Sequence, residues 1–422
     1  MTNTPRSPLW HPFTQHGLEP VMTNVARAEG AWLETAEGAR IFDAISSWWV
    51  VTHGHRQPRI VAAVKDQLDK LDQVIFAGFT HRPAEELARG LVEITPAGLN
   101  RVFLSDSGST AVEVALKMAL GYWRNRGEKR TRILALEHAY HGDTVGTMSA
   151  GARGLFNASY EPLLFDVGRI PFPAVGREQA TLDALEIACK RGDVAAFICE
   201  PLILGAGGML MYEAETLRDM HAICRAHGVL FIADEVMTGF GRTGTLFACE
   251  QAAIVPDIMC LAKGLTGGAL PLAATLCSSA IYDAHYSTDR TRMFFHSSSY
   301  SANPVCCAAA NANLAIWRDE PVRNRVATLA SMQAERLGPL RTSSRFEDVR
   351  QLGTITALDL AGHDEGYAAN ISLSVRAFCL QRGVLLRPLG RTIYVMPPYC
   401  TTAQDLDLVY ATIAQAAEEV TA

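Results

Sequence analysis

Two short apolar runs near the middle of the chain, each followed at once by a charged residue, constrain the fold more than any other feature. Residues 229–233 (VLFIA) lead into Asp234 and Glu235, and residues 258–262 (IMCLA) lead into Lys263. A run that is apolar at every position is typical of a strand buried on both faces of a parallel sheet. Open sheets of this kind bind ligands where their strands end. We therefore expect Asp234 and Lys263 to lie close together at one edge of a buried sheet.

Each of these two residues also has an ordinary structural interpretation. An aspartate at a strand end often starts a turn, and a lysine among glycines is commonly a solvated loop charge. Together they indicate chemistry, because a positioned, partly desolvated lysine amine condenses with an aldehyde. An aspartate facing a pyridine nitrogen keeps that nitrogen protonated, so that the ring accepts electrons. At about 4 Å and an effective dielectric near 20, this attraction is about 4 kcal/mol, or roughly three pKa units.

The composition favours a protein that acts on small molecules. The net charge is −6 and no basic run is visible, which argues against a nucleic-acid or anionic-membrane partner. No stretch approaches the ~20 apolar residues that a membrane span needs, and no apolar leader is visible in residues 1–10. The ten cysteines are scattered without a C-x-x-C pair, so neither a disulfide framework nor a metal site is indicated. We expect a soluble, cytoplasmic protein.

The chain is long enough for two domains. With 422 residues, 49% hydrophobic, it can bury a large core. Strand and helix signals alternate from about Arg101 to Trp317, as a mostly parallel sheet requires. We expect a large domain over residues 51–317, a smaller α+β domain over residues 318–422, and an N-terminal segment, residues 1–50, that joins the smaller domain. The smaller domain should contain a long polar helix, an alternating strand at 352–360, a helix near 372–381 and a terminal helix from about Ala403.

The charged ends of the two runs resemble the signature of class III (subgroup II) aminotransferases, which use pyridoxal phosphate (PLP). The matching residues are DEV at 234–236 and LAKGLTGG at 261–268. The resemblance implies a fold-type-I α/β transferase that is a homodimer with its active sites at the subunit interface. It implies that Lys263 binds the cofactor covalently and moves the substrate proton, and that Asp234 faces the ring nitrogen. Together with Tyr140, these two would be the catalytic residues.

A turn that enters a helix is a second candidate for the cofactor site. Residues 102–104 read as a strand, and residues 105–110 (SDSGST) read as a turn before an apolar-periodic helix. The free N–H groups of such a helix start can hold a phosphate, although strand-turn-helix connections of this composition are common. Thr110 and Glu113 are spaced for a capping box. In the family that the chain resembles, the phosphate cradle corresponds to Ser107, Gly108 and Ser109.

Other cofactor contacts follow from the same resemblance. Tyr140, after the expected strand 132–136, would stack on one face of the pyridine ring, and Val236 would cover the other. Ser299 would reach the phosphate of the partner subunit's cofactor. Taken alone, a loop tyrosine is equally well explained as structure, and a serine-rich turn is usually only a turn. Just beyond that turn, Asn303 and Pro304 predict the start of a helix that runs to about Trp317, with Asn303 as its N-cap.

Two aromatic clusters, at residues 10–13 (WHPF) and 46–49 (SSWW), are candidates for the substrate pocket. Such aromatics are more often core packing. They resemble clusters that wall the pocket in the branch of the family that serves biotin synthesis, where Phe13 is commonly a tyrosine. Arg387 would bind a substrate carboxylate, as guanidinium groups do. The resemblance assigns the substrate to Phe13, Trp48, Tyr140, Lys263, Ser298, Arg387 and Tyr394.

Three further features have mainly structural interpretations. His141 is expected to be a satisfied loop histidine, because no nucleophile accompanies it. Glu200, after the apolar run 194–199, either supports the cofactor's ring hydroxyl or shapes a turn. Residues 239–244 (GFGRTG) match G-x-G-x-x-G, but the strand and helix that a dinucleotide site needs do not flank them as required.

The resemblance implies a specific reaction. An amino group would pass from S-adenosylmethionine, or another donor, through PLP to 8-amino-7-oxononanoate, giving 7,8-diaminononanoate for biotin. One alternative is a class III transaminase for another ω-amino acid, which the Trp48–Trp49 pair disfavours. Another is a regulatory module that binds PLP without turnover, which the presence of Lys263, Asp234 and Arg387 disfavours.

Overall fold

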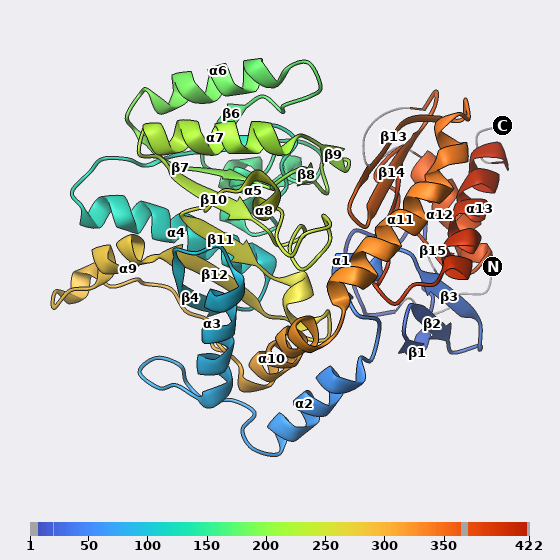
Figure 1. Ribbon diagram of the computed structural model, residues 1–422, viewed down its shortest axis with the longest axis horizontal. Helices are drawn as coiled ribbons and strands as arrows, with labels where there is room; N and C mark the ends of the chain where they lie inside the picture. Colours follow the sequence, from blue (N-terminus) through green and yellow to red (C-terminus); the bar gives the residue numbers. More distant parts are fainter. Residues whose placement is uncertain (1–6, 20, 364–369, 420–422) are drawn as a thin grey trace.

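The fold is built on a seven-stranded sheet whose three central strands are buried at every position. The structure, a computed structural model, describes residues 7–19, 21–363 and 370–419. Figure 1 shows this sheet in the larger lobe, with a smaller lobe beside it. In spatial order the strands are β4 (Leu99–Ser105), β12 (Ala273–Ser278), β11 (Ile258–Leu261), β10 (Leu230–Asp234), β7 (Val194–Cys199), β5 (Arg132–Leu136) and β6 (Gly168–Ile170).

The sheet is mostly parallel, as predicted. Only β12 runs against its neighbours, pairing antiparallel with both β11 and β4. The two apolar runs form β10 and β11, which are adjacent and parallel, with Asp234 in register with Cys260. The expected closeness of Asp234 and Lys263 follows, because Lys263 lies just beyond the end of β11.

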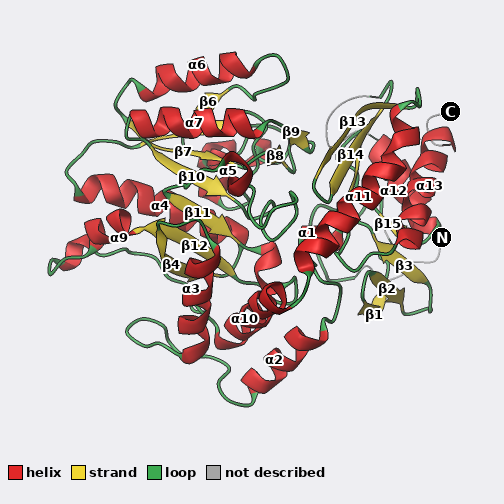
Figure 2. Cartoon of the chain, viewed as in Figure 1, coloured by secondary structure: helices red, strands yellow, loops and turns green. Residues whose placement is uncertain are grey.

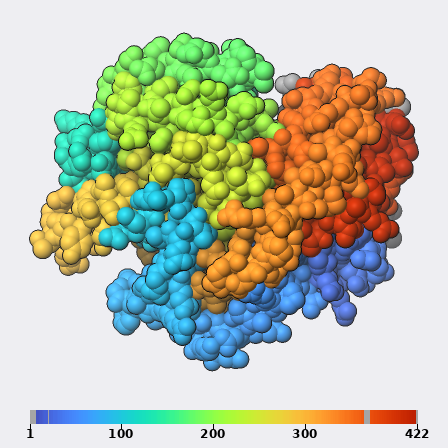
Figure 3. Space-filling view, viewed as in Figure 1, coloured from blue at the N-terminus to red at the C-terminus, as the bar shows by residue number. Residues whose placement is uncertain are grey.

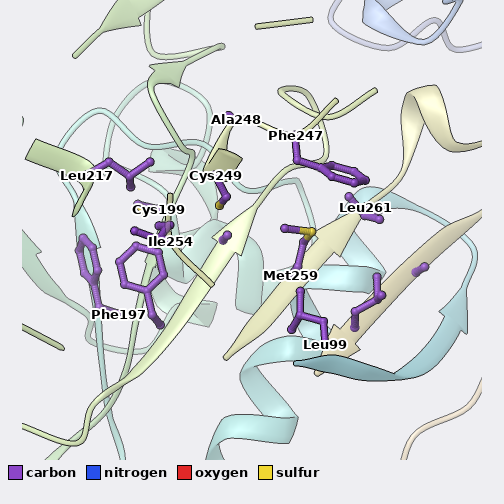
Figure 4. Packing of buried hydrophobic residues seen from close by; sticks show 14 of the residues in the cluster. Leu99, Phe197, Cys199, Leu217, Phe247, Ala248, Cys249, Ile254, Met259 and Leu261 are labelled. Carbon is purple, nitrogen blue, oxygen red and sulfur yellow. The ribbon is translucent and has the colours of Figure 1, made fainter. Parts of the chain in front are cut away.

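Alternation along the strands divides the core between the two faces of the sheet. Phe197, Phe231 and Met259 face one cluster, which helices including α6 and α7 cover. Their neighbours in sequence, such as Ile198 and Ile232, face a second cluster that α4 covers. Figure 2 shows helices on both sides of the strands, and Figure 4 shows packing within the first cluster. Because both faces are covered, the central strands β7, β10 and β11 are apolar at every position except Asp234, the last residue of β10.

Both helices that the sequence pattern predicts in the larger lobe are present, as α4 and α10. Asn303 caps α10 as predicted, since its side chain accepts hydrogen bonds from the N–H groups of Val305 and Cys306, both at 3.0 Å. The helices and short strands of this lobe are α2 (Pro58–Leu68), α3 (Arg82–Ile94), α4 (Gly108–Asn125), α5 (Val145–Ala150), η1 (Ala158–Leu163), α6 (Glu178–Cys189), β8 (Ile203–Leu204), β9 (Leu210–Met211), α7 (Ala214–Ala226), α8 (Cys249–Ala252), η2 (Lys263–Thr266), α9 (Ser279–His285), η3 (Arg290–Arg292) and α10 (Pro304–Asp319).

The smaller lobe combines segments from both ends of the chain. Its first sheet has the order β1-β2-β3-β15, in which the C-terminal strand β15 runs parallel to the N-terminal strand β3. Figure 3 shows the C-terminal residues of this lobe packed against the larger one. Its elements are β1 (Val25–Glu29), β2 (Trp32–Thr35), β3 (Arg40–Asp43), α1 (Ser46–Trp49), α11 (Val322–Arg341), β13 (Phe346–Leu352), β14 (Ile355–Leu360), α12 (Ile371–Gln381), β15 (Val384–Leu385), β16 (Thr392–Val395) and α13 (Ala403–Glu419).

The predicted strand at 352–360 is present as β14, but it begins three residues later than expected, because Leu352 ends β13 and the two antiparallel strands meet there in a hairpin. The turn uses Gly353 in a left-handed conformation (φ +54°), where an added Cβ would lie 2.2 Å from the carbonyl carbon of Thr243. A glycine inside an alternating pattern therefore marked a turn and not a strand interior. No helix in the described residues is long and apolar enough to cross a membrane.

Arg242, in the glycine-rich loop 239–244, ties the two lobes together. Its guanidinium is buried and donates hydrogen bonds to the carbonyl oxygens of Trp49 (3.1 Å), Val51 (3.0 Å) and Pro397 (3.0 Å). Its own carbonyl accepts a hydrogen bond from the Thr354 N–H at 2.9 Å. Burial lowers the pKa of the guanidinium. This loop therefore serves as a structural clamp between the N-terminal segment, the hairpin and the C-terminal segment.

We predict that Arg242→Met lowers the free energy of unfolding by roughly 3–5 kcal/mol, because three buried carbonyl groups lose a charged donor. Arg242→Lys should recover only part of the loss, since one ammonium lacks the planar fork that reaches several carbonyls. Urea unfolding followed by fluorescence measures this, with the exposed Arg323→Met on α11 as the control. A loss below about 1 kcal/mol, typical of surface substitutions, would show that the clamp is unimportant.

Candidate active site

A cavity of about 430 Å³ opens where the parallel strands of the large lobe end. The predicted cofactor residues of this lobe come together there, although they lie on separate strands and loops. Those that line the cavity are Ser107, Gly108, Ser109, Tyr140, Asp234, Val236 and Lys263. Trp49, His141 and Glu200 line it too.

Lys263 starts the turn η2 in a strained, left-handed conformation, with φ of +41°. Its Nζ lies 4.7 Å from the centroid of the Trp49 ring. Burial lowers the pKa of this amine to about 8, although the negative charges of Asp234 and Glu200 act in the opposite direction. At pH 7, about a tenth of such amines are neutral, against fewer than one in a thousand for an ordinary lysine. The side chain is therefore suited to act as a nucleophile and a proton acceptor.

Asp234 is held by a residue that sequence reasoning treated as structural. Its Oδ2 lies 2.7 Å from Nδ1 of His141, and its Oδ1 accepts a hydrogen bond from the Val236 N–H at 3.2 Å. Nε2 of His141 is buried and has no hydrogen-bond partner among the described residues. The sequence could have indicated this contact, because His141 follows β5 at the same edge of the sheet where Asp234 ends β10.

The two other acidic residues near the strand ends have different environments. Glu200 accepts hydrogen bonds from the N–H groups of Tyr140 (3.0 Å) and Gly205 (2.9 Å), and burial raises its pKa to about 7. It therefore holds the loop that carries Tyr140. Glu235 accepts hydrogen bonds from the Ala248 N–H at 3.0 Å and the Cys249 N–H at 2.8 Å. Of the acidic pair that ends β10, only Asp234 lines the cavity.

The start of α4 has the form of an anion-binding cradle. Ser107 is the N-cap, and its Oγ accepts from the Thr110 N–H at 3.2 Å while Thr110 Oγ1 accepts from the Ser107 N–H at 2.9 Å. A Cβ added to Gly108 would lie 2.6 Å from Cγ1 of Val236, so the cradle requires glycine there. Free N–H groups and the positive end of the helix dipole favour an anion at this point.

The predicted capping box of Thr110 and Glu113 is wrong. The helix starts at Gly108, which places Thr110 three residues after the cap and pairs it with Ser107. The Glu113 carboxylate instead accepts hydrogen bonds from the Thr144 Oγ1 (2.6 Å) and the Gly146 N–H (2.8 Å) at the start of α5. Glu113 thereby fixes the far end of the loop that carries Tyr140. Burial raises the pKa of the Tyr140 hydroxyl, which keeps it neutral.

The predicted substrate residues form a second group beside the cavity. The rings of Phe13 and Trp48 meet edge to face at 5.5 Å, and the Arg387 guanidinium lies 5.1 Å from the Trp48 ring. Phe156, which sequence reasoning missed, contacts Phe13 (5.8 Å) and Tyr140 (6.3 Å) and so links this group to the cofactor cavity. Phe13 and Arg387 also line a neighbouring cavity of about 380 Å³.

Other predicted residues lie outside both cavities within this one chain. Tyr394 is buried behind Trp49, with ring centroids 5.9 Å apart. Ser298 is half-buried and Ser299 is exposed, and neither lines the cavity that contains the chain's own cradle. Trp10, expected in the aromatic wall, is 92% exposed and lines neither cavity.

The Trp48–Trp49 pair is presented by an unusual left-handed turn. Ser46, Ser47, Trp48 and Trp49 all have positive φ, between +45° and +74°. Such backbone costs roughly 1–2 kcal/mol per residue, and buried polar contacts hold it. The carboxylate of Asp43 accepts hydrogen bonds from the N–H (2.8 Å) and the hydroxyl (2.7 Å) of Ser47. The turn places Trp49 beside Lys263 and Trp48 beside Arg387.

Comparison with known proteins places the chain in one family. The family model Aminotransferase class-III matches residues 13–417. The adenosylmethionine-8-amino-7-oxononanoate aminotransferase of Synechococcus elongatus is 48% identical, over 98% of this chain and 99% of that protein. The protein of the same name from Nitratidesulfovibrio vulgaris is 41% identical, over 98% and 80% of the two chains.

Solved structures agree with this placement. The crystal structure of the adenosylmethionine-8-amino-7-oxononanoate aminotransferase of Methanocaldococcus jannaschii superimposes with a TM-score of 0.93 at 33% identity, covering 98% of this chain and 97% of that one. A PLP-bound amine transaminase from an uncultivated Pseudomonas species gives 0.92 at 32% identity, covering 98% and 99%. The chain belongs to the class III aminotransferase family.

Proposed function

We propose that the chain is a PLP-dependent transaminase that aminates 8-amino-7-oxononanoate to 7,8-diaminononanoate in biotin synthesis, with S-adenosylmethionine or another amine as donor. The observation that carries the proposal is the meeting of Lys263 and Asp234 in one cavity, at the ends of adjacent parallel strands. Relatives at 36–48% identity, over nearly the whole chain, bear the name of this reaction.

The residues of the cavity fit PLP. The start of α4 offers a phosphate cradle at Ser107, Gly108 and Ser109, and Asp234 offers a carboxylate for a ring nitrogen. Tyr140 and Val236 both line the cavity and would cover the faces of a flat ring. When bound, the cofactor supplies a protonated pyridine ring that accepts the electrons released as the substrate loses a proton.

The chain's own residues have distinct roles in this proposal. Lys263 would hold the cofactor covalently, and its amine, when free, would carry the proton that the substrate carbon loses. Its lowered pKa suits it to accept a proton near neutrality. Asp234 keeps the ring nitrogen charged, and His141 fixes the orientation of the Asp234 carboxylate through the 2.7 Å contact.

Lys263→Ala should abolish the link to the cofactor. We expect borohydride to fix one cofactor per wild-type chain, located at Lys263 by peptide mass spectrometry, and none in the variant, which should still bind cofactor through the cradle. Lys117→Ala is the matched control, because Lys117 also lies on the large lobe but donates to the carbonyl of Phe295. A reducible link that survives in Lys263→Ala would mean that another lysine holds the cofactor.

The aromatic group explains the choice of a long acceptor. Arg387 suits the carboxylate of any amino-acid substrate, so it does not choose among them. Phe13 and Trp48 are 39% and 38% exposed, which leaves apolar ring surface for a substrate to cover. Burial of a methylene contributes about 0.8 kcal/mol, so an aliphatic nine-carbon acceptor gains more from this surface than a short, doubly charged one.

We predict that the amine form of the cofactor, bound to the protein, is returned to the aldehyde form by 8-amino-7-oxononanoate and only poorly by 2-oxoglutarate. Trp48→Ala should weaken the long acceptor by roughly tenfold or more, because apolar contact is lost, and a short acceptor much less. Phe13→Tyr should be tolerated. For wild type and each variant, the absorbance of the cofactor in a single turnover measures its reaction with the long and with the short acceptor. A preference for 2-oxoglutarate would indicate a transaminase for another ω-amino acid.

We also propose a cytoplasmic homodimer in which residues 51–317 bind the cofactor and residues 318–422, joined by residues 1–50, form the smaller domain. The proposal that a second copy covers this surface is supported by the exposed apolar side chains around Ser299. Phe295, Tyr300, Phe79 and Ile75 are each more than half exposed. The Gln73 side chain joins the segments that carry them by donating to the Ser299 carbonyl at 2.7 Å. Ser299 is thereby presented outward, where it can reach the phosphate held by a second copy.

Mixed dimers test the shared site. A Lys263→Ala chain paired with a Ser299→Ala chain should contain one site with both defects and one intact site, hence about half the wild-type activity. The Ser299→Ala homodimer should bind the cofactor roughly 10–100-fold more weakly, because a hydrogen bond to a charged group is lost. If Ser299 serves its own chain, the mixed dimer will instead show at most half the activity of the Ser299→Ala homodimer at limiting cofactor.

A further inference from the structure

We propose that Asn313 is a positioning residue that fixes the turn carrying Lys263 and thereby holds the amine in the cavity. The proposal rests on the role of Lys263 given above and concerns how that lysine is kept in place. Asn313 lies on α10, outside the cavity, and acts through the backbone of η2.

The amide of Asn313 is fully used within the protein. The residue is 0% exposed, and its Nδ2 donates hydrogen bonds to the carbonyl oxygens of Gly264 and Leu265, both at 3.0 Å. These are the two residues that follow Lys263. The Oδ1 lies 2.8 Å from Nε2 of His53. Because carbonyl oxygens only accept, the amide nitrogen must face the turn and the amide oxygen must face His53.

His53 holds the Asn313 amide in place as a neutral hydrogen-bond donor. Burial lowers its pKa to about 4, so the imidazole is uncharged at neutral pH. A neutral imidazole with its proton on Nε2 donates to the Asn313 oxygen, which fixes the amide orientation. The next residue back along the chain, Thr52, donates from its N–H to the carbonyl of Gly267 at 3.3 Å. Hydrogen bonds from the N-terminal segment and from α10 therefore both stabilise the turn that carries Lys263.

The turn needs such support because its backbone is strained at Lys263, its first residue. Lys263 has φ of +41°, whereas Gly267, just after the turn, has φ of +67°, which glycine adopts without strain. A non-glycine residue in the left-handed region persists only where its surroundings determine it. The hydrogen bonds of Asn313 therefore hold the turn at the point where its backbone would otherwise relax and move Lys263.

Asn313 is also out of place as a residue of a buried helix face. The other buried positions of α10 are apolar or cysteine: Pro304, Val305, Cys307, Ala309, Ala310 and Ile316. Asparagine is a weak helix former and is costly to bury without partners. An apolar residue would serve helix packing better, so the two carbonyl contacts are the reason for an amide here.

Asn311 provides a matched comparison on the same helix. Its Nδ2 donates to the carbonyl of Pro83 at 2.9 Å, which ties α10 to α3 and not to the lysine turn. A general role in stability would make the two asparagines equivalent. A role in positioning Lys263 would be specific to Asn313.

The test measures the Lys263 amine in protein prepared without cofactor. We follow the rate at which an amine reagent modifies Lys263 between pH 6 and 11 by peptide mass spectrometry, for wild type, Asn313→Leu and Asn311→Leu. The wild-type midpoint should lie near 8. Asn313→Leu should raise it by about one pH unit, because a looser turn lets water reach the amine. Asn311→Leu should leave it unchanged.

A second readout uses the protein with cofactor. Asn313→Leu should lower kcat by roughly 10–100-fold with little change in KM, because misplacement of a reacting group by about 1 Å has this effect. Asn313→Ala provides the same test should the leucine variant fail to fold. An unchanged labelling midpoint in a folded Asn313 variant, or an equal shift in Asn311→Leu, would overturn the proposal. These outcomes do not depend on the substrate, and Lys263→Ala tests the role of the lysine separately.

Discussion

The site depends on the burial of a lysine and an aspartate at the ends of two adjacent strands. Desolvation lowers the pKa of the Lys263 amine to about 8, and the charges of Asp234 and Glu200 keep it from falling further. An amine with an ordinary pKa would be almost fully protonated near neutrality, and one buried without acidic neighbours would have a lower pKa still. The parallel sheet supplies this balance, because it brings the ends of β7, β10 and β11 to one edge.

The smaller lobe contributes to the site through a strained turn of its backbone that presents Trp49. The left-handed turn from Ser46 to Trp49 joins this lobe to the cavity, and Arg242 from the larger lobe donates to the Trp49 carbonyl. The ring of Trp49 then lies 4.7 Å from the lysine amine. The hydrogen bonds that join the two lobes therefore also position Trp49 in the site. A substitution that weakens the contacts of Arg242 should displace the Trp49 ring from the lysine amine.

The sequence predicted the features that local patterns determine. Fully apolar runs identified β10 and β11, and an Asn-Pro pair identified the start of α10. Apart from the meeting of Asp234 and Lys263, local patterns did not predict contacts between distant segments. Nothing local shows that His141 reaches Asp234 across 93 positions, that Glu235 turns toward Ala248, or that four residues without glycine form a left-handed turn. The hairpin β13–β14 was missed for a local reason, since a glycine within an alternating run was read as a strand position.

One helix connects the two parts of the proposed shared site. The loop that presents Ser299 leads directly into α10, whose cap Asn303 also donates to the carbonyl of Asp72 at 2.9 Å. About three turns further along, the same helix donates from Asn313 to the lysine turn. A helix of this length moves as a rigid body, so a shift at its capped end is carried to the turn. If a second copy contacts Ser299, as proposed above, this helix gives a physical reason for that contact to affect the position of Lys263 in the same chain.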